Sequence, residues 1–234
     1  MALPKIDVPV YSTELPSTGE VIKYRPFLVR EQKQLLIAQN AGLEHQTQAV
    51  IDLVNECTFN KLDVRKLPAY DLEYLFLRLR ANSVGENIDL VLTCGECGNK
   101  QDAQLDLTTV GVSKYEDHNA NVDLGNGLLV NLADPDLESL AQLRGNTNPG
   151  ADEIIILIAR CIRTIWKNDD MYSALDYSPA ELVEFVENLS PGSFSKLEQF
   201  FLTMPKLRHE ITFKCNKCEA DNTAALEGLQ SFFG

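Results

Sequence analysis

The spacing of apolar positions along the first part of the chain changes from that of strands to that of helices. Two short β-prone runs flank the turn-rich sequence PSTGE at 16–20, which predicts a β-hairpin. Within residues 28–86, apolar positions then recur at helical spacing in three segments, and Gly85 follows the third in the position of a helix C-cap. We therefore expect a hairpin followed by three helices.

The pattern becomes that of strands in the next segment. Ile88, Leu90 and Leu92 alternate with polar residues before a pair of cysteines, and a second alternating run follows the pair. This arrangement predicts a strand, a tight turn and another strand. The polar segment 112–127 is expected to be a loop that leads into a strand at 127–133.

Helical spacing returns after residue 133, and three pairs with proline mark helix starts. Asp134–Pro135, Asn148–Pro149 and Ser178–Pro179 each place a capping residue before a proline at the first helical position. Glu181 stands three residues after Ser178, which completes a capping box. These signals predict a series of helices, the last of which stops at Pro205.

The most apolar stretch of the chain is residues 153–166. It is too short to span a bilayer, and it carries Arg160 and Arg163, so it predicts a buried helix. The N-terminal sequence has no apolar core of the kind found in signal peptides, and prolines interrupt it. We therefore expect no contact with a membrane and synthesis in a cytoplasm, where thiols stay reduced.

Four of the six cysteines form two C-x-x-C pairs, Cys94 with Cys97 and Cys215 with Cys218. A two-residue gap lets both thiolates of a pair turn toward one cation, and two such pairs supply the four ligands of a tetrahedral zinc site. Four protein ligands leave no open coordination position, so the expected zinc ion is structural rather than catalytic.

The long separation between the two pairs is unusual for a zinc ribbon. The entropy of closing a loop grows only logarithmically with its length, so the separation does not oppose a shared site. Two other interpretations stay open, namely two independent redox pairs and four thiols without a metal. Cys57 and Cys161 lie on apolar helical faces and are expected to pack in the core.

The residue that follows the second cysteine differs between the two pairs. Gly98 directly follows Cys97, and a glycine there lets the chain turn so that backbone N–H groups point at the sulfur atoms. Glu219 has the equivalent position after Cys218, so we expect the second turn to differ. Three lysines near the pairs in sequence are candidates to offset the negative charge of four thiolates, namely Lys100, Lys214 and Lys217.

Together these patterns predict an α+β fold that is mainly helical, with an N-terminal β-hairpin and a zinc-ribbon-like β unit interrupted by a helical insertion. The expected domains are residues 1–86 for the hairpin and first helices, 87–133 with 206–234 for the β unit, and 134–205 for the insertion. The segment 206–234 is expected to give a strand, the second cysteine pair and a short amphipathic helix. We find no internal repeat beyond the cysteine pairs.

No pattern in the sequence indicates an enzyme. His45, His118 and His209 stand alone, and the chain has no P-loop, G-x-S-x-G or G-x-G-x-x-G sequence. Asp134 and Asp136 are better explained by helix capping than by acid–base catalysis. The C-terminal sequence SFFG is expected either to anchor a partner or to dock on the core.

The charge of the chain bears on its partners. Its 34 acidic and 21 basic residues give a net charge of −13, which opposes general binding to nucleic acid. This charge counts against a zinc ribbon that contacts nucleic acid or transcription machinery. A thiol–disulfide oxidoreductase is another alternative, and tightly bound zinc would exclude it.

Three sequences in the first part of the chain resemble those of one viral family. They are LPSTGEVIKYRPFLVREQK at 15–33, VIDLVNECTF at 50–59 and LPAYDLEYLFLRLRANSVGE at 67–86. They resemble the baseplate hub subunit family of T-even-type contractile-tailed bacteriophages, and the resemblance covers residues 3–93.

The resemblance implies a structural component of the central hub of the tail baseplate, assembled with other baseplate hub and tail proteins in the host cytoplasm and located in the virion. It implies an oligomeric assembly and no catalytic residues. It carries no zinc site, so the zinc prediction depends on the cysteine spacing alone. A second possibility within the same assembly is a hub chaperone that is absent from the mature virion.

Overall fold

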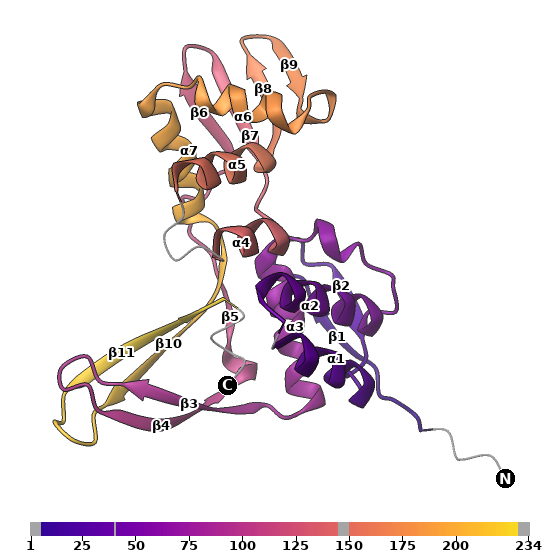
Figure 1. Ribbon diagram of the computed structural model, residues 1–234, viewed down its shortest axis with the longest axis vertical. Coiled ribbons are helices and arrows are strands. Elements are labelled where there is room, and N and C mark those ends of the chain that lie inside the picture. The colour runs from indigo at the N-terminus through magenta and orange to yellow at the C-terminus, as the bar shows by residue number, and fades with distance from the viewer. Residues whose placement is uncertain (1–5, 40, 145–149, 229–234) are drawn as a thin grey trace.

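The computed structural model describes residues 6–39, 41–144 and 150–228 (Figure 1). Helices account for 42% of these residues and strands for 28%, with the strands arranged in four sheets. The fold is therefore mixed α+β, and the expectation of a mainly helical protein is wrong. The expected helix cap at Asn148–Pro149 and the terminal SFFG lie outside the described residues.

The N-terminal part packs a hairpin and three helices around one apolar core, as its sequence predicts. Its elements are β1 (Tyr11–Glu14), β2 (Val21–Tyr24), α1 (Val29–Gln39), α2 (Leu43–Cys57), the 3-10 helix η1 (Val64–Lys66) and α3 (Ala69–Ser83). Val50, Val54 and Cys57 form a buried stripe on α2 and share a core with Leu72 and Leu75 of α3. The helical spacing predicted for α2 is thereby confirmed.

A buried carboxylate holds this hairpin against α3. Asp71 accepts a hydrogen bond of 3.0 Å from the backbone N–H of Ser17, and the Ser17 hydroxyl donates to its other oxygen. Burial of the Asp71 side chain raises its pKa above the ordinary value. The two hydrogen bonds fix the turn between β1 and β2 at the start of α3.

Two hairpins that are far apart in sequence lie side by side and form an extended arm (Figure 1). The elements of the arm and its base are β3 (Asn87–Thr93), β4 (Lys100–Asp106), the 3-10 helix η2 (Leu107–Thr109), β5 (Gly111–Ser113), β10 (Lys206–Lys214) and β11 (Asp221–Glu227). β3 pairs with β4, and the other three strands have the order β11-β10-β5. Ile88, Leu105 and Leu207 pack with Leu77 of α3, which anchors the arm to the N-terminal part.

β11 occupies the place where the sequence analysis expects a C-terminal helix. Half-buried Asn222, Ala224 and Leu226 alternate with exposed neighbours, and the segment pairs with β10 along its whole length. A short run of alanine and leucine fits either a helical or a strand period, so pairing with a neighbouring strand decides its structure. The expected amphipathic helix is therefore wrong for residues 221–227.

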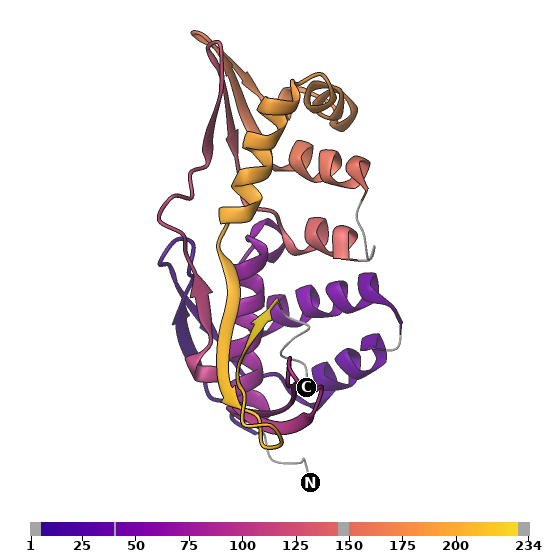
Figure 2. The ribbon, with the colours of Figure 1, turned by 90° about the vertical axis from the view of Figure 1, so that its left-hand side faces the viewer.

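The remaining elements form a four-stranded antiparallel sheet covered by helices. They are β6 (Asn121–Gly125), β7 (Leu128–Leu132), α4 (Leu137–Arg144), α5 (Ala151–Cys161), β8 (Ile162–Lys167), β9 (Asp170–Ser173), the 3-10 helix η3 (Ala174–Asp176), α6 (Pro179–Glu187) and α7 (Pro191–Thr203). The strand order is β6-β7-β8-β9, and Figure 2 shows α5 and α6 on one side of the sheet. Val130, Ile158 and Leu197 are fully buried in the core between sheet and helices.

Two of these strands lie where the sequence analysis expects a loop or a helix. β6 joins β7 through Asn126 and Gly127, whose φ angles of 54° and 70° are those of the type I′ turn that Asn-Gly favours. α5 ends at Cys161, so the single helix expected over 153–166 is wrong. β-branched and aromatic residues favour the strand that follows, and the expected helical insertion therefore contains the hairpin of β8 and β9.

No helix within the described ranges is long and apolar enough to cross a membrane.

The predicted helix caps are confirmed in part. The Ser178 side chain and its partner glutamate form the expected capping box at the start of α6. At the start of α4, Asp136 accepts a hydrogen bond of 2.7 Å from the backbone N–H of Ser139. Asp134 does not cap this helix, because its carboxylate instead accepts a hydrogen bond of 3.0 Å from the Tyr70 hydroxyl.

Candidate metal centre

The tips of the two arm hairpins bring Cys94, Cys97, Cys215 and Cys218 together. Their sulfur atoms all lie within 4.8 Å of one another. Two cross-hairpin distances are 3.7 Å, one between Cys94 and Cys218 and one between Cys97 and Cys215. Each pair of cysteines comes from a different hairpin, and the two hairpins are far apart in sequence, so the cluster exists only when both hairpins are in place.

The two cysteine pairs lie in two turns that have the same pattern of backbone hydrogen bonds. In the first turn, the N–H of Gly98 donates to the carbonyl of Cys94 at 3.0 Å, and the N–H of Cys94 donates to the carbonyl of Asn99. In the second turn, the N–H of Glu219 donates to the carbonyl of Cys215 at 3.0 Å, and the N–H of Cys215 bonds in the same way to the residue after Glu219. The two tips are therefore copies of one local structure.

Gly98 and Glu219 both adopt a left-handed backbone conformation, with φ angles of 68° and 60°. The expectation that the second turn would differ is therefore wrong. Glycine adopts this conformation without strain, whereas a residue with a Cβ atom is disfavoured there. Glu219 thus shows that the geometry of the turn is imposed by its surroundings rather than chosen by its own residue type.

The sulfur positions fit a tetrahedral metal ion. Zinc–sulfur bonds of about 2.3 Å in a tetrahedron place the sulfur atoms about 3.8 Å apart, close to the 3.7 Å of the two cross-hairpin pairs. A disulfide needs sulfur atoms about 2.0 Å apart, and all four thiols are free. The side chains of Cys94 and Cys215 are buried, while those of Cys97 and Cys218 are exposed.

Backbone N–H groups favour the thiolate form at Cys94 and Cys215, whereas the neighbouring cysteine sulfur atoms raise the pKa of Cys218. Hydrogen bonds from the N–H groups of Cys97 and Glu96 lower the pKa of Cys94 to about 6. The N–H groups of Cys218 and Lys217 lower the pKa of Cys215 in the same way. Backbone N–H dipoles are thus the main groups that stabilise the negative charge of these two thiolates.

Amide side chains tie the two tips together, and the sequence analysis does not identify them. Asn222 accepts a hydrogen bond from the N–H of Gly95 at 2.9 Å, and Gln101 accepts one from the N–H of Asn216 at 2.9 Å. Gln101 and Asn222 occupy equivalent positions in the two hairpins, so the contacts are reciprocal. Asn222 also donates to the sulfur of Cys94 at 3.5 Å. Only an alignment of one hairpin with the other would have indicated these residues in advance.

The lysines near the cysteine pairs contribute less to the contacts of the sulfur atoms than the backbone and amide groups do. The ammonium group of Lys214 lies 3.6 Å from a carboxylate oxygen of Glu219, and both side chains are exposed. Lys217 contacts the sulfur of Cys215 through its backbone N–H, at 3.5 Å, and not through its side chain. The structure therefore places backbone and amide groups, rather than ammonium groups, on the sulfur atoms.

The other two cysteines lie elsewhere, as expected. Cys57 and Cys161 are buried in the two larger cores. Burial raises the pKa of Cys57 to about 11 and that of Cys161 to about 12, so both remain protonated thiols near neutral pH. Within the described part of the chain, the four tip cysteines are the one cluster of potential metal ligands.

His118 lies in a polar contact between elements rather than at the cysteines. Its Nδ1 atom is 3.2 Å from the Thr203 hydroxyl, and its Nε2 atom is 3.3 Å from a carboxylate oxygen of Asp134. The ring also packs on Phe200, with 4.7 Å between ring centroids. These contacts join the loop before β6 to the end of α7.

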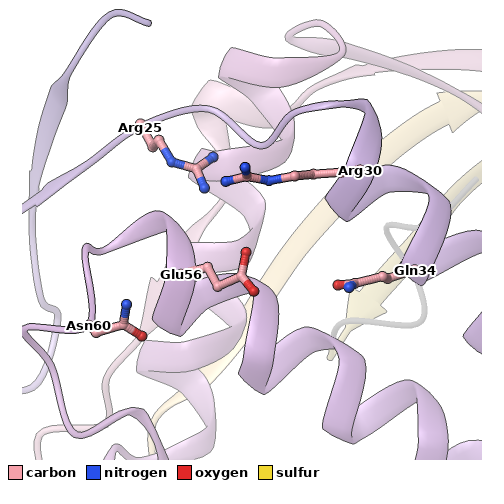
Figure 3. A pocket seen from close by; sticks show the side chains of 5 residues that line it. All are labelled: Arg25, Arg30, Gln34, Glu56 and Asn60. Atoms are coloured by element: carbon pink, nitrogen blue, oxygen red, sulfur yellow. The ribbon is translucent and has the colours of Figure 1, made fainter.

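A second polar site lies beside α1 (Figure 3). Its cavity of about 560 Å³ is lined by Arg25, Arg30, Gln34, Glu56 and Asn60. Buried Glu31 accepts hydrogen bonds from Arg25 at 2.9 Å and from Arg30 at 2.6 Å. Burial alone would raise the pKa of Glu31, but these hydrogen bonds outweigh it and lower the pKa to about 2. Because the arginines already pair with Glu31, we interpret the site as a structural ion pair.

Comparison with known families gives one match. A family model described as T4 bacteriophage base plate protein matches residues 8–234, which is nearly the whole chain and includes both cysteine pairs. Comparison with curated proteins and with solved structures finds no significant match. The family match extends well beyond the residues 3–93 that carry the resemblance to hub subunits. The chain therefore belongs to the T4 bacteriophage base plate protein family.

Proposed function

We propose that the chain is a permanent structural subunit of the central hub of a phage tail baseplate, and that its four clustered cysteines hold a structural zinc ion. Membership of the family makes the chain a baseplate component of the virus tail that works beside other baseplate or tail proteins. The hub position is the finer part of the proposal, and the resemblance of residues 3–93 to hub subunits supports it.

The arrangement of the cysteines supports the zinc part of the proposal. Four thiols within 4.8 Å of one another give a closed ligand set, with no open position for water or substrate. Thiolate ligands in a tetrahedral arrangement suit zinc among the common metals. A closed site of this kind stabilises structure and performs no chemistry, which agrees with a role in assembly.

The position of the cysteines indicates what the zinc ion would do. It would join the tip of the β3–β4 hairpin to the tip of the β10–β11 hairpin, which otherwise meet through side-chain contacts such as that between Gln101 and the carbonyl of Lys214 at 3.2 Å. The metal would thereby hold the arm in one shape. A rigid arm presents a fixed surface to neighbouring subunits, in an oligomeric assembly built in the host cytoplasm.

The hub role is tested by measuring the amount of this protein in purified mature tails and in lysates of infected cells. We expect a fixed ratio to other baseplate proteins in mature tails. Presence in the lysate with absence from tails would instead identify a hub assembly chaperone. Absence from both would contradict a role in the baseplate.

The zinc site is tested by elemental analysis of the purified protein. We expect one zinc ion per chain, lost in Cys94→Ser and in Cys215→Ser because three thiolates no longer close the site. Cys57→Ala is the matched control, since it removes a buried thiol elsewhere and should retain the zinc. Wild-type protein that binds no zinc after purification under reducing conditions would contradict this part of the proposal.

A further inference from the structure

The four-stranded sheet has two edges, and they differ in how they are covered. The edges are β6 and β9, at the two ends of the order β6-β7-β8-β9. α7 packs along β6, where Lys196 donates a hydrogen bond of 2.8 Å to the backbone carbonyl of Asp123. No described strand pairs with the outer side of β9. An uncovered edge strand is a template for pairing with another chain.

The turn between β8 and β9 determines which backbone groups of β9 are free. Lys167 and Asp170 flank a two-residue turn, and such flanking residues exchange backbone hydrogen bonds. Bonded and non-bonded pairs then alternate along an antiparallel ladder, so Met171 and Ser173 are not bonded to β8. The N–H and C=O of Met171 and the N–H of Ser173 therefore point outward. In the described part of the chain, no other group hydrogen-bonds to these three.

Large apolar side chains surround this edge. Five lie within residues 166–177, and their exposed fractions are Trp166 39%, Met171 54%, Tyr172 40%, Leu175 95% and Tyr177 39%. Trp166 and Met171 are paired across the two strands, next to Ile165, which packs in the core. They therefore lie on the face of the sheet that points away from the helices. Tryptophan, tyrosine and methionine are enriched in protein–protein interfaces.

The charge beside the edge indicates the kind of partner. Asp169 precedes β9, Asp170 is its first residue and pairs with Lys167 of β8, and Asp176 follows the other end; the three aspartates are exposed. None of them forms an ion pair with another described residue. Antiparallel pairing of β9 with β9 of a second copy would bring the acidic turn of each chain toward Asp176 of the other. That repulsion disfavours self-association and favours a basic partner.

We propose that β9 is completed by an extended segment of another phage tail protein, which pairs with its free backbone groups and carries lysine or arginine beside apolar side chains. Main-chain hydrogen bonds supply affinity in this mode of recognition, and alternate side chains supply specificity. The surface is separate from the cysteine centre. The inference goes beyond the hub proposal and holds for any subunit or chaperone of the tail.

The partner is identified by photo-crosslinking in infected cells. The chain is supplied with p-benzoylphenylalanine in place of Leu175, in cells infected with phage that lack a working copy of the gene. We expect a cross-link to an extended, basic segment of a different tail protein. Cross-links form during assembly, so absence of the chain from mature tails would refute the hub proposal and leave this result unaffected.

Two variants of the crosslinking chain test the pairing itself. Met171→Pro removes an outward N–H without removing a hydrogen bond to β8, because proline is tolerated on edge strands. The double variant Asp169→Lys with Asp170→Lys reverses the local charge. We expect each to reduce the cross-linked product about tenfold, which corresponds to about 1.4 kcal/mol. Glu184→Lys with Glu187→Lys on α6 changes the net charge equally and should leave the product unchanged.

Folding of the variants is checked by circular dichroism and thermal unfolding, because Trp166 is the cross-strand neighbour of Met171 and its emission would change with that substitution alone. If Met171→Pro misfolds, the charge reversal still tests the proposal. Cross-links to a second copy of the chain, or to a helix of the partner, would overturn it. Undiminished cross-linking in the folded Met171→Pro variant, or in the Asp169→Lys/Asp170→Lys variant, would overturn it as well.

Discussion

Glu219 occupies a turn whose geometry suits glycine. Its φ angle of 60° matches the 68° of Gly98 at the equivalent position of the other turn. A side chain in this conformation costs about 1 kcal/mol relative to glycine. The ion pair between Glu219 and Lys214 joins two exposed side chains and offsets little of this cost.

We expect Glu219→Gly to raise the free energy of unfolding by about 1 kcal/mol, and Gly98→Ala to lower it by a similar amount. Denaturant unfolding of the metal-loaded protein measures both. Lys214→Ala is the control for the lost ion pair and should have little effect. A loss of stability in Glu219→Gly would show that the carboxylate has a role beyond the turn.

Glu31 is a buried charge held by Arg25, Arg30 and the backbone N–H of Leu28. Its pKa is about 2 in the folded chain, against an ordinary value of 4.5. The stabilisation is therefore fully present above about pH 4.5 and is lost as the pH falls toward 2. The same residue also caps the start of α1, so its loss affects both the ion pair and the helix.

Glu31→Gln should lower the free energy of unfolding by about 2 kcal/mol at neutral pH, because it leaves the mostly buried guanidinium of Arg25 without a charged acceptor. The difference from wild type should shrink as the pH is lowered from 5 to 2. Denaturant unfolding across this pH range measures it, with exposed Glu187→Gln as the control. A difference that does not change with pH would assign the effect to packing instead of charge.

At the scale of elements, the β3–β4 and β10–β11 hairpins repeat one sequence pattern. Ala103 and Leu105 after the first cysteine pair correspond to Ala224 and Leu226 after the second. In the sequence only the cysteines are recognisable as a repeat, because few other positions are identical. The structure extends the repeat to the whole hairpin and explains why Gln101 and Asn222 make reciprocal contacts.

Removal of the metal by a chelator should loosen these two hairpins before it affects the larger cores. The cysteines lie at the tips of the arm, whereas the apolar contacts with α3 lie at its base. We expect backbone amides of the four arm strands to exchange with solvent at least tenfold faster after chelation. Amides of α2 and α3 serve as the internal control. Equal acceleration in α2 would show that the metal stabilises the chain globally.

The elements differ in how far the sequence determines them. The spacing of Val50, Val54 and Cys57 is enough to predict α2, because its periodicity persists over a long segment. The segments of β6, β8 and β11 have no clear strand period in sequence, and tertiary pairing selects their structure. The conformation of Glu219 is beyond prediction from its residue type. The C-x-x-C spacing predicts which cysteines cluster, but the amides that join the tips depend on the fold.

At the scale of the whole molecule, α4 connects the two larger cores. Leu140 packs against the N-terminal core and also against the core under the four-stranded sheet. The division at residues 133 and 134 between a β unit and an insertion stays a prediction, and hydrogen bonds between β7 and β8 cross it. Limited proteolysis would show which segments separate.

Leu140→Ala should uncouple the two cores and cost about 2 kcal/mol. Trp166, the single tryptophan, lies in β8 and reports on the sheet alone, whereas circular dichroism reports on all helices. We expect the two signals to change at one temperature in the wild type and at two in Leu140→Ala. Leu202→Ala, at a side chain that is 64% exposed, is the control and should behave as the wild type. A single transition in both variants would show that α4 is not the main link.

The order in which the chain leaves the ribosome determines when the four cysteines of the centre can come together. Cys94 and Cys97 emerge early, but Cys215 and Cys218 follow only after both larger cores have been translated. Until then the first pair has half of a ligand set, which cannot close a tetrahedron. If the centre holds the proposed zinc ion, metal capture would be a late event of biogenesis, and a filled site would mean that everything between the two pairs has already been made.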